Sequence, residues 1–441
     1  MTTPIYNFVQ KYIKSGTSRF HMPGHKGNGP LGVEPLDITE IAGADILYGA
    51  DGIIAESEEN ATALFKTAHT YYSTEGSTLA IKAMLALAIA GKSEPVILAA
   101  RNVHKAFIFA AALLDFGVEW IYPDEGEHLC SCHLSPDGLQ AAIEALPRLP
   151  DAVYITSPDY LGNIADVSAL SEVCRRYGIP LLVDNAHGAY LAFTAPALHP
   201  IAQGAAMCAD SAHKSLPALT GGAYLHISKN ATQYIASARN MLSLFASTSP
   251  SYLILQSLDL LNSHIFNEYP QRLECAISKT EKTKRELQKL GFAPESTEPL
   301  KIVINAAKYG YTGDELAEHL RQNRIECEFS DRDFIVLMTS TENGDADYSR
   351  LVSVMSAIKP KTALPERRTV LPRSQKAMTL RKAVLSPSET IRTELAEGRI
   401  LAAPTVSCPP AVPIAVSGEL ITKAVIEALT AYGISEVSVV V

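Results

Sequence analysis

Short apolar segments alternate with helix-like segments between residues 67 and 228, and this alternation constrains the fold more than any other feature. The runs PVILA (95–99), AVYIT (152–156) and PLLV (180–183) have the length and composition of buried strands. Helical segments at residues 103–116, 135–146 and 167–177 separate them, and Ser135 is a candidate N-cap of the second. The pattern predicts a mainly parallel sheet with helices on both faces. Ligands of such sheets bind beyond the carboxyl ends of the strands, so we expect the functional residues there.

The rest of the chain predicts a second, smaller domain. Residues 252–290 have a helical pattern, and another alternating unit follows at residues 301–338. The terminal part should contain a helix at 389–397, a proline-rich turn at 408–413 and a helix at 421–431. We therefore expect an α/β fold whose parts are an N-terminal arm (1–45), a large sheet domain (46–290) and a smaller α+β domain (291–441) with a connector near 360–375.

Composition and charge exclude several classes of protein. Hydrophobic residues make up 47% of the 441 residues and charged residues 19%, which indicates a globular protein with a substantial core. The net charge of −9 argues against nucleic-acid binding and is compatible with a cationic substrate. The apolar stretch at 79–90 is too short to span a bilayer, and the N-terminus lacks an export signal. We expect no membrane association.

The seven cysteines favour a reducing compartment. They are scattered and odd in number, and the tightest group is CSCH at residues 130–133. A metal site at this group would need a second ligand pair at a comparable spacing, and none follows nearby. We therefore expect reduced thiols in a cytoplasmic protein and no bound metal.

Two strand ends carry residues suited to cofactor chemistry. Asp184 follows the strand at 180–183, and a carboxylate there can pair with a protonated ring nitrogen and keep an electron sink charged. Lys214 lies in SAHK (211–214), after a small-residue run at 205–209 that we expect to be a short strand. A lysine beneath a ring can form a Schiff base when desolvation and nearby cations lower its pKa. Taken alone, a helix-capping aspartate and a solvated lysine are the ordinary interpretations.

Two further sequences lie at expected helix starts. TEGST (74–78) precedes an Ala/Leu-rich helix, and its glycine and hydroxyls could donate hydrogen bonds to a phosphate. An ordinary N-cap explains this motif equally well. His104, in RNVHK (101–105), could lie flat on a cofactor ring, although a lone histidine is more often a packing or capping residue.

The order of these elements carries more weight than any one of them. A hydroxyl-rich helix start comes first, followed by His104, then Asp184 at a strand end, and then Lys214. This order resembles the fold-type I pyridoxal-5′-phosphate (PLP) enzymes, the aspartate aminotransferase-like superfamily. The resemblance implies that PLP is the cofactor and that Lys214 forms the Schiff base.

Nearly the whole chain resembles a narrower group, the short Orn/Lys/Arg decarboxylases that lack an N-terminal receiver-like domain. The matching sequences are FHMPGHKG (20–27), DITE (37–40), GAD (43–45), EGST (75–78), RNVHK (101–105), PDYLG (158–162), VDNAHG (183–188), SAHK (211–214), STSPSY (247–252), GRI (398–400) and PPAVP (409–413). FHMPGHKG and SAHK are specific together. The resemblance implies PLP-dependent decarboxylation of arginine, lysine or ornithine in polyamine biosynthesis, by a homodimer or higher homo-oligomer.

The resemblance also assigns roles to single residues. Asp184 would pair with the pyridine nitrogen, while His104 and Ala186 would pack on the two faces of the ring. His213 would transfer a proton or lie beside the phosphate. The expected phosphate and further cofactor contacts are Gly76, Ser77, Thr78, Ser211, His187 and, from a neighbouring subunit, Thr248 or Ser249. Glu419 is a candidate for contacting a distal cationic group of the substrate, although a solvated helix-start glutamate is nearly as good an interpretation.

Four positions depart from the family pattern. Asn185 stands where the family usually has glutamate, and Gly221 stands where it usually has glutamine. Ala411 replaces a glycine and Ser417 a proline near the C-terminus. None of these changes removes the chemistry expected of Lys214. The C-terminal changes leave the identity of the substrate open.

Two other functions remain compatible with the sequence. An aminotransferase or lyase of the same fold would bind the α-carboxylate through an arginine, and Arg321, Arg324 and Arg332 are available. A decarboxylase should not anchor that carboxylate firmly, because ground-state binding opposes its loss. A non-catalytic PLP-fold sensor or binding protein is the alternative from another class, and the presence of Lys214 argues against it.

Overall fold

The computed structural model describes residues 1–124, 127–295, 297–365, 371–404 and 412–441. The chain forms two compact units, each built from two stretches of sequence. The first unit consists of Met1–Ala90 and Pro180–Leu273, and the second of Gly91–Ile179 and Glu274–Val441. The domain boundaries expected near residues 45 and 290 stay predictions.

Seven strands form one mostly parallel sheet in the order β1-β7-β6-β5-β4-β2-β3. The first unit contributes β1 (His69–Ser73), β5 (Leu181–Asp184), β6 (Met207–Asp210) and β7 (Ala223–Ile227). Strand β5 runs parallel to β6, whereas β7 runs antiparallel to both β6 and β1. Every residue of β5, β6 and β7 is buried, which explains their nearly continuous apolar sequences. The α/β fold expected from the sequence is confirmed.

The helices of the first unit lie before, between and after its strands in the sequence. They are α1 (Pro4–Lys14), η1 (Glu34–Leu36), η2 (Leu47–Gly49), α2 (Ile53–Phe65), α3 (Gly76–Ile89), η3 (Ala189–Phe193), α7 (Ala212–Ser215), η4 (Thr232–Tyr234), α8 (Ile235–Ser243) and α9 (Tyr252–Asn267), with α10 (Tyr269–Lys289) crossing into the second unit. Helix α3 is apolar on nearly all sides, and its side chains from Leu79 onward are almost all buried. It contacts β6, β7 and α8, which is why the Ala/Leu-rich sequence suits it.

The second unit contributes the parallel strands β2 (Val96–Ala100), β3 (Gly117–Ile121) and β4 (Ala152–Thr156). Strand β3 lies at an edge of the sheet. Helices α4 (Lys105–Leu114) and α5 (Pro136–Glu144) connect these strands, and α6 (Val167–Arg176) follows β4. Ser135 caps α5 by accepting a hydrogen bond from the Gly138 amide, as expected from the sequence. The predicted elements between residues 95 and 184 are therefore confirmed to within a few residues.

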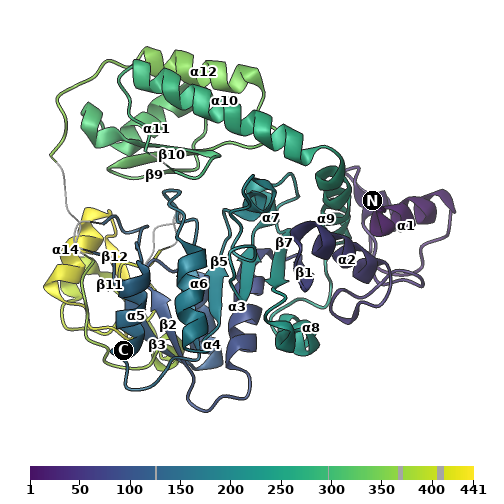
Figure 1. The fold of residues 1–441 in the computed structure, drawn as a ribbon, viewed down its shortest axis with the longest axis horizontal. Helices are drawn as coiled ribbons and strands as arrows, with labels where there is room; N and C mark the ends of the chain where they lie inside the picture. The colour runs from purple at the N-terminus through teal and green to yellow at the C-terminus, as the bar shows by residue number, and fades with distance from the viewer. Residues whose placement is uncertain (125–126, 296, 366–370, 405–411) are drawn as a thin grey trace. The chain divides into compact units, whose positions relative to one another are not determined.

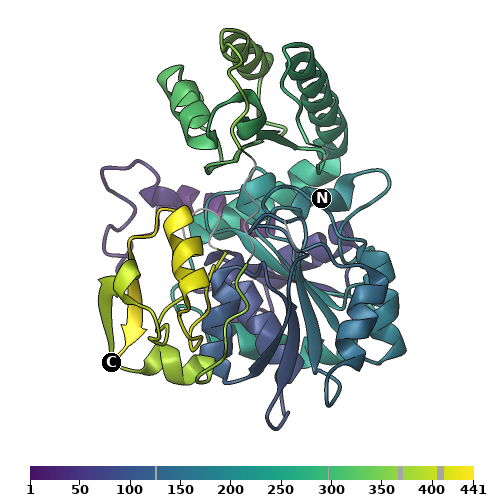
Figure 2. The ribbon, with the colours of Figure 1, turned by 90° about the vertical axis from the view of Figure 1, so that its left-hand side faces the viewer.

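A second, three-stranded antiparallel sheet in the order β8-β10-β9 lies in the same unit. Its elements are β8 (Lys301–Asn305), η5 (Ala306–Tyr309), α11 (Gly313–Gln322), β9 (Phe329–Ser330), β10 (Phe334–Met338) and α12 (Asp345–Ser356). Figures 1 and 2 show α10, α11 and α12 on one face of this sheet. Leu287, Leu316 and Ile335 belong to the core that joins the helices to the sheet.

The C-terminal part forms a two-stranded antiparallel sheet beside a helix. Its elements are α13 (Leu380–Leu385), β11 (Ser388–Arg392), η6 (Thr393–Leu395), α14 (Lys423–Ala431) and β12 (Glu436–Val440). Figure 1 shows α14 against this pair of strands, and Val425 and Val439 share its core. The helix expected at residues 389–397 is wrong, because residues 388–392 pair with β12 as a strand.

Some expectations lie outside the described residues. Ala411 and most of the proline-rich turn expected at 408–413 are among them, as is the middle of the connector near 360–375. Among the helices that the structure describes, none combines the length and the apolar character that crossing a bilayer would require.

Candidate active site

The carboxyl ends of β5 and β6 bring two loops of the first unit together. The strands are parallel, with Asp184 opposite Ala209, and the Asn185 amide donates to the Ala209 carbonyl. Asp184 is buried, and one of its carboxylate oxygens accepts a hydrogen bond from the Ala186 amide at 3.2 Å. The residues after both strands therefore leave the sheet at the same edge, where a ligand of this fold is expected.

Lys214 lies in the short helix α7, which begins just after β6. Its Nζ atom is 3.2 Å from Nε2 of His187, a residue of the loop that follows β5. The structure thus joins the two loops through an amine and an imidazole, a pairing that the sequence did not predict. Lys214 is exposed in the single chain, so the desolvation expected around this lysine is not provided by the chain alone.

The start of α3 has the features of an anion site. Gly76 has a left-handed backbone (φ 72°), and a Cβ atom at this position would meet no other atom within 4 Å. No side chain caps the helix, so the amides that follow Gly76 stay available to a ligand, while the Gly76 amide donates to the Gly221 carbonyl. Ser211 Oγ donates to Ser77 Oγ at 2.7 Å, which brings the hydroxyl before α7 to the start of α3. Thr78 is exposed beside them.

Gly221 explains one departure from the family pattern. Its carbonyl accepts a hydrogen bond from the Gly76 amide at 2.8 Å, which ties the loop after Lys214 to the start of α3. Its φ of 99° is in the left-handed region, and a Cβ atom there would lie 2.8 Å from the Thr74 carbonyl oxygen. A glutamine side chain does not fit this backbone.

His213 and the residues near 248 have simpler surroundings. The ring of His213 donates from Nδ1 to the Gly222 carbonyl, and burial lowers its pKa, so it is neutral at physiological pH. Thr248 and Ser249 are exposed, and the amide of their neighbour Ser247 donates to Glu75 beside the α3 start. An exposed position suits a contact with a neighbouring subunit, and the phosphate contact itself stays a prediction.

His104 and Glu419 belong to the second unit. His104 is the N-cap of α4, where its Nδ1 atom accepts a hydrogen bond from the Ala106 amide at 3.1 Å. Its expected stacking on a cofactor ring stays a prediction. Glu419 is buried, with its Oε2 atom 3.9 Å from Nη2 of Arg101. Its expected contact with a distal group of the substrate also stays a prediction.

A buried polar cluster beside the end of β6 was missed by the sequence analysis. Asp210 accepts hydrogen bonds from His199 at 2.9 Å, from His226 at 3.1 Å and from the Asn185 amide group at 2.7 Å. Burial raises the pKa of Asp210, but the two imidazoles outweigh it and hold this pKa well below its usual value. Asn185 therefore has a structural reason to replace glutamate, because a glutamate would bring a second carboxylate against Asp210.

Cys208 completes a set of four side chains of metal-binding type whose ligand atoms lie within 4.8 Å of one another. The hydrogen bonds of His199 explain this set without a metal ion. Its Nδ1 atom accepts from the Ile201 amide, so its proton is on Nε2 and points to Asp210. In the sequence, the one indication of this cluster is that Asp210 directly precedes Ser211.

The first unit fits PLP on the evidence of its own geometry. The open, uncapped start of α3, with Ser77 and Ser211, suits a phosphate. The buried carboxylate of Asp184 suits a protonated ring nitrogen, and Lys214 supplies an amine at the end of the neighbouring strand.

Solved structures have the same fold. The constitutive lysine decarboxylase of E. coli matches with a TM-score of 0.80 at 17% identity, covering 100% of this chain and 82% of that one. Lysine decarboxylase A from Pseudomonas aeruginosa matches with a TM-score of 0.76 at 18% identity, covering 97% of this chain and 75% of that one. At these identities the likeness establishes the fold-type I architecture.

Sequence comparison gives the family. An arginine decarboxylase of Bacillus subtilis is 29% identical, covering 96% of this chain and 91% of the relative. An uncharacterized B. subtilis protein, YaaO, is also 29% identical, covering 98% of this chain and 94% of the relative. The family model for the major domain of Orn/Lys/Arg decarboxylases matches residues 3–305. The chain therefore belongs to the Orn/Lys/Arg decarboxylase family and is a PLP-dependent decarboxylase of a basic amino acid.

Proposed function

We propose that this protein removes the α-carboxyl group of L-arginine as carbon dioxide and releases agmatine. The choice of arginine rests on the relatives by sequence, since arginine decarboxylases of B. subtilis and Halalkalibacterium halodurans are 29% and 28% identical over almost the whole chain. The lysine decarboxylases are similar in fold at 17–18% identity. The observation that carries the chemistry is the approach of Lys214 Nζ to His187 Nε2 at adjoining strand ends.

We assign the cofactor contacts from the geometry of the first unit. Ser77, Ser211 and the amides that follow Gly76 in α3 would hold the phosphate, and Asp184 would hold the ring nitrogen in its protonated form. Bound PLP supplies a ring that accepts the electron pair left behind when the α-carboxyl group departs. His104 would pack against this ring, as the family resemblance implies.

The chain's own histidines would manage the protons. His187 can take a proton from Lys214 Nζ across the 3.2 Å contact, which leaves the amine able to react. His213 is held neutral, with Nδ1 donating to Gly222, so its Nε2 atom can accept a proton from water and deliver it to the substrate carbon that has lost its carboxyl group. Glu419, the sequence-based candidate for the distal cationic group of the substrate, lines a pocket at the edge strand β3, and we propose that it binds a cation there instead.

We propose that the protein is a homodimer. Apolar side chains are exposed along the N-terminal segment, with Phe20 97%, Leu31 81% and Met22 70% exposed. So large an exposed apolar surface is typical of a covered interface. Thr248 and Ser249 are exposed as well, which suits a contact with the neighbouring subunit. Sedimentation of the holoenzyme as a monomer would contradict this proposal.

We also propose that the enzyme acts in the cytoplasm and supplies amines for polyamine synthesis. The six cysteines that the structure describes are all free thiols, as expected in a reducing compartment. Agmatine, the expected product, carries a cationic group at each end and is a precursor of the polyamine type. Depletion of polyamines on deletion of the gene would support this role, and unchanged levels would contradict it.

The function is tested by incubating the purified holoenzyme with arginine, lysine and ornithine separately and measuring carbon dioxide and amine. Lys214→Ala should lower turnover of arginine by at least about 1,000-fold, because the variant lacks the reactive amine. Lys229→Ala is the matched control, since this lysine is exposed in the same unit and lies after β7.

The possible results distinguish decarboxylation through Lys214 from the choice of arginine as the substrate. Turnover of lysine or ornithine in preference to arginine would overturn the arginine proposal alone. Release of a keto acid in place of an amine, or equal turnover by wild type and Lys214→Ala, would overturn decarboxylation through Lys214.

A further inference from the structure

A pocket of about 640 Å³ lies along the edge strand β3 in the second unit. Its walls come from five segments of that unit, which are residues 94–96, residues 115–122 around the edge strand, Arg148, residues 374–380 and residues 416–419. Four acidic and two basic residues line it: Glu94, Asp115, Glu119, Glu419, Arg148 and Lys376. The pocket is therefore acidic on balance and favours a cation.

One end of the pocket contains an incompletely paired buried carboxylate. Glu419 is 6% exposed, and its Oε2 atom accepts from the Val416 amide at 2.8 Å and lies 3.9 Å from Arg101. The hydroxyls of Ser374 and Ser417 are buried in the same wall, with no hydrogen-bond partner in the described part of the chain. Buried polar groups normally have partners, so this end is suited to a ligand.

The other end of the pocket is acidic and open to solvent. Asp115 and Glu119 are exposed there on the turn before the edge strand and on the strand itself, and Glu94 is exposed just before β2. Arg381 is 4.0 Å from Asp115, at the limit of an ion pair. A second cationic group would find carboxylate partners at this end.

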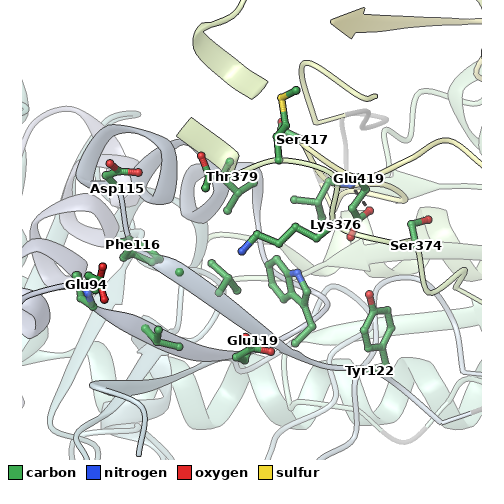
Figure 3. A pocket seen from close by; sticks show the side chains of 18 of the residues that line it. Glu94, Asp115, Phe116, Glu119, Tyr122, Ser374, Lys376, Thr379, Ser417 and Glu419 are labelled. Carbon is green, nitrogen blue, oxygen red and sulfur yellow. Dashed lines mark hydrogen bonds between the residues drawn. The ribbon is translucent and has the colours of Figure 1, made fainter. Parts of the chain in front are cut away.

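The middle of the pocket is apolar and already contains an alkyl amine of the chain itself. Phe116, Trp120 and Leu380 contribute apolar surface. Figure 3 shows Lys376 extended across the pocket, with its amino group directed toward the end where Phe116 and Asp115 lie. The side chain of Lys376 is a four-carbon chain that ends in an ammonium group, so it occupies the pocket as a tethered analogue of an alkyl amine.

We propose that this pocket binds a linear aliphatic chain with a cationic group at each end, of the diamine and agmatine class. One cation would contact Glu419, Ser374 and Ser417, and the other would contact Glu119 and its acidic neighbours. The ligand would displace the Lys376 side chain. The proposed function makes agmatine the product of this enzyme, and the inference that the pocket gives feedback control rests on that function.

A path from the pocket to the expected cofactor loop runs through Arg101. Arg101 is fully buried and donates to the carbonyls of Pro413 and Ile414, besides lying near Glu419. It begins the turn after β2 that leads to His104. A ligand cation at Glu419 competes with Arg101 for the same carboxylate, so binding should shift this turn and lower the turnover number.

Binding is tested by titrating agmatine into the purified holoenzyme in a calorimeter. Glu119→Gln should weaken binding about threefold to fivefold, the effect of losing one exposed charge pair. Lys376→Gln should tighten binding by about fivefold, because it removes the competing ammonium. Glu397→Gln is the matched control, since this glutamate is exposed in the same unit and does not line the pocket. A role of Lys376 in folding alone would not tighten binding.

The effect of agmatine on turnover is measured by adding it to the arginine decarboxylation assay. We expect a lower kcat with little change in KM, and half-inhibition at a lower agmatine concentration for Lys376→Gln. Purely competitive inhibition would contradict the proposed binding of agmatine in this pocket. Equal affinities of wild type, Glu119→Gln and Lys376→Gln for agmatine would contradict it as well. Calorimetry does not need turnover, so a failure of the proposed function leaves the binding result interpretable.

Discussion

Two buried carboxylates in different units of the chain have opposite surroundings. Asp210 in the first unit accepts hydrogen bonds from His199, His226 and Asn185, all within 3.1 Å. Glu419 in the second unit has one amide donor and an arginine at 3.9 Å. The pKa of Asp210 is held well below its usual value by the two imidazoles, against the effect of burial. Burial raises the pKa of Glu419, and Arg101 offsets this only in part.

The difference shows that the hydrogen-bond partners of a buried carboxylate indicate whether it stabilises the fold or can bind a ligand. A buried charge that is fully hydrogen-bonded stabilises the fold, and removing one member of such a set is costly. A buried charge with a missing partner costs stability, so a ligand that supplies the partner can bind there. Asp210 is the first case, and its hydrogen bonds join the ends of β5 and β6 next to the cofactor residues. Glu419 is the second case, and it lines an open pocket.

The largest expected effect is that of Asp210→Asn. The amide cannot accept from all three donors, so at least one buried donor loses its partner. We expect the free energy of unfolding to fall by about 3 kcal/mol, within the range for breaking a buried charged set. Urea unfolding of the two proteins measures this loss. A change below about 1 kcal/mol would show that the cluster does not stabilise the strand ends.

Asn185→Asp should have the next largest effect. It places a second carboxylate 2.7 Å from Asp210, and two carboxylates at that distance must share a proton. We expect a loss of about 2 kcal/mol near pH 8 that shrinks as the pH falls. The pKa of the pair is raised in the folded state, so the stability present at low pH is lost as the pH rises. A loss that does not depend on pH would contradict this explanation.

Much of the fold could be predicted from the sequence. The strands of the large sheet are short apolar runs, and β4 at Ala152–Thr156 lies where AVYIT predicts it. The segment at 388–392 was mistaken for a helix because its charged residues hide a strand that only pairing with β12 stabilises. Local patterns contain little information on such a partner, which lies more than forty residues later in the chain.

The candidate site was predicted only where its residues stand in compact motifs. Asp184 and Lys214 could be found because each follows a recognisable strand in a known sequence pattern. The contact of Lys214 with His187 could not be predicted, and neither could the partners of Asp210. Both depend on which loops the order of the strands in the sheet brings together. The same holds for the pocket at β3, which is formed by segments of the second unit that lie far apart in the sequence.

The pH dependence of stability should separate the two carboxylates by sign. The folded-state pKa of Asp210 is lowered from 3.8, so its stabilising contribution is present above that value and is lost as the pH falls below it. The folded-state pKa of Glu419 is raised from 4.5, so its contribution is present below that value and is lost as the pH rises through the folded pKa. Unfolding free energies of wild type, Asp210→Asn and Glu419→Gln between about pH 3 and pH 8 measure both. If both carboxylates changed the free energy of unfolding in the same direction with pH, the proposed difference between Asp210 and Glu419 would be contradicted.

Glu419→Gln should have the smallest effect on stability, although it makes the same acid-to-amide change as Asp210→Asn. The glutamine oxygen can still accept from the Val416 amide, and Arg101 keeps the carbonyls of Pro413 and Ile414 as partners. The variant also loses a carboxylate whose burial is poorly compensated. The 3.9 Å approach to Arg101 is too long for a hydrogen bond, so we expect a change of less than about 1 kcal/mol near pH 8. A loss as large as that of Asp210→Asn in the same urea experiment would mean that Glu419 is fully paired, and the pocket would then lack the cation site at this end.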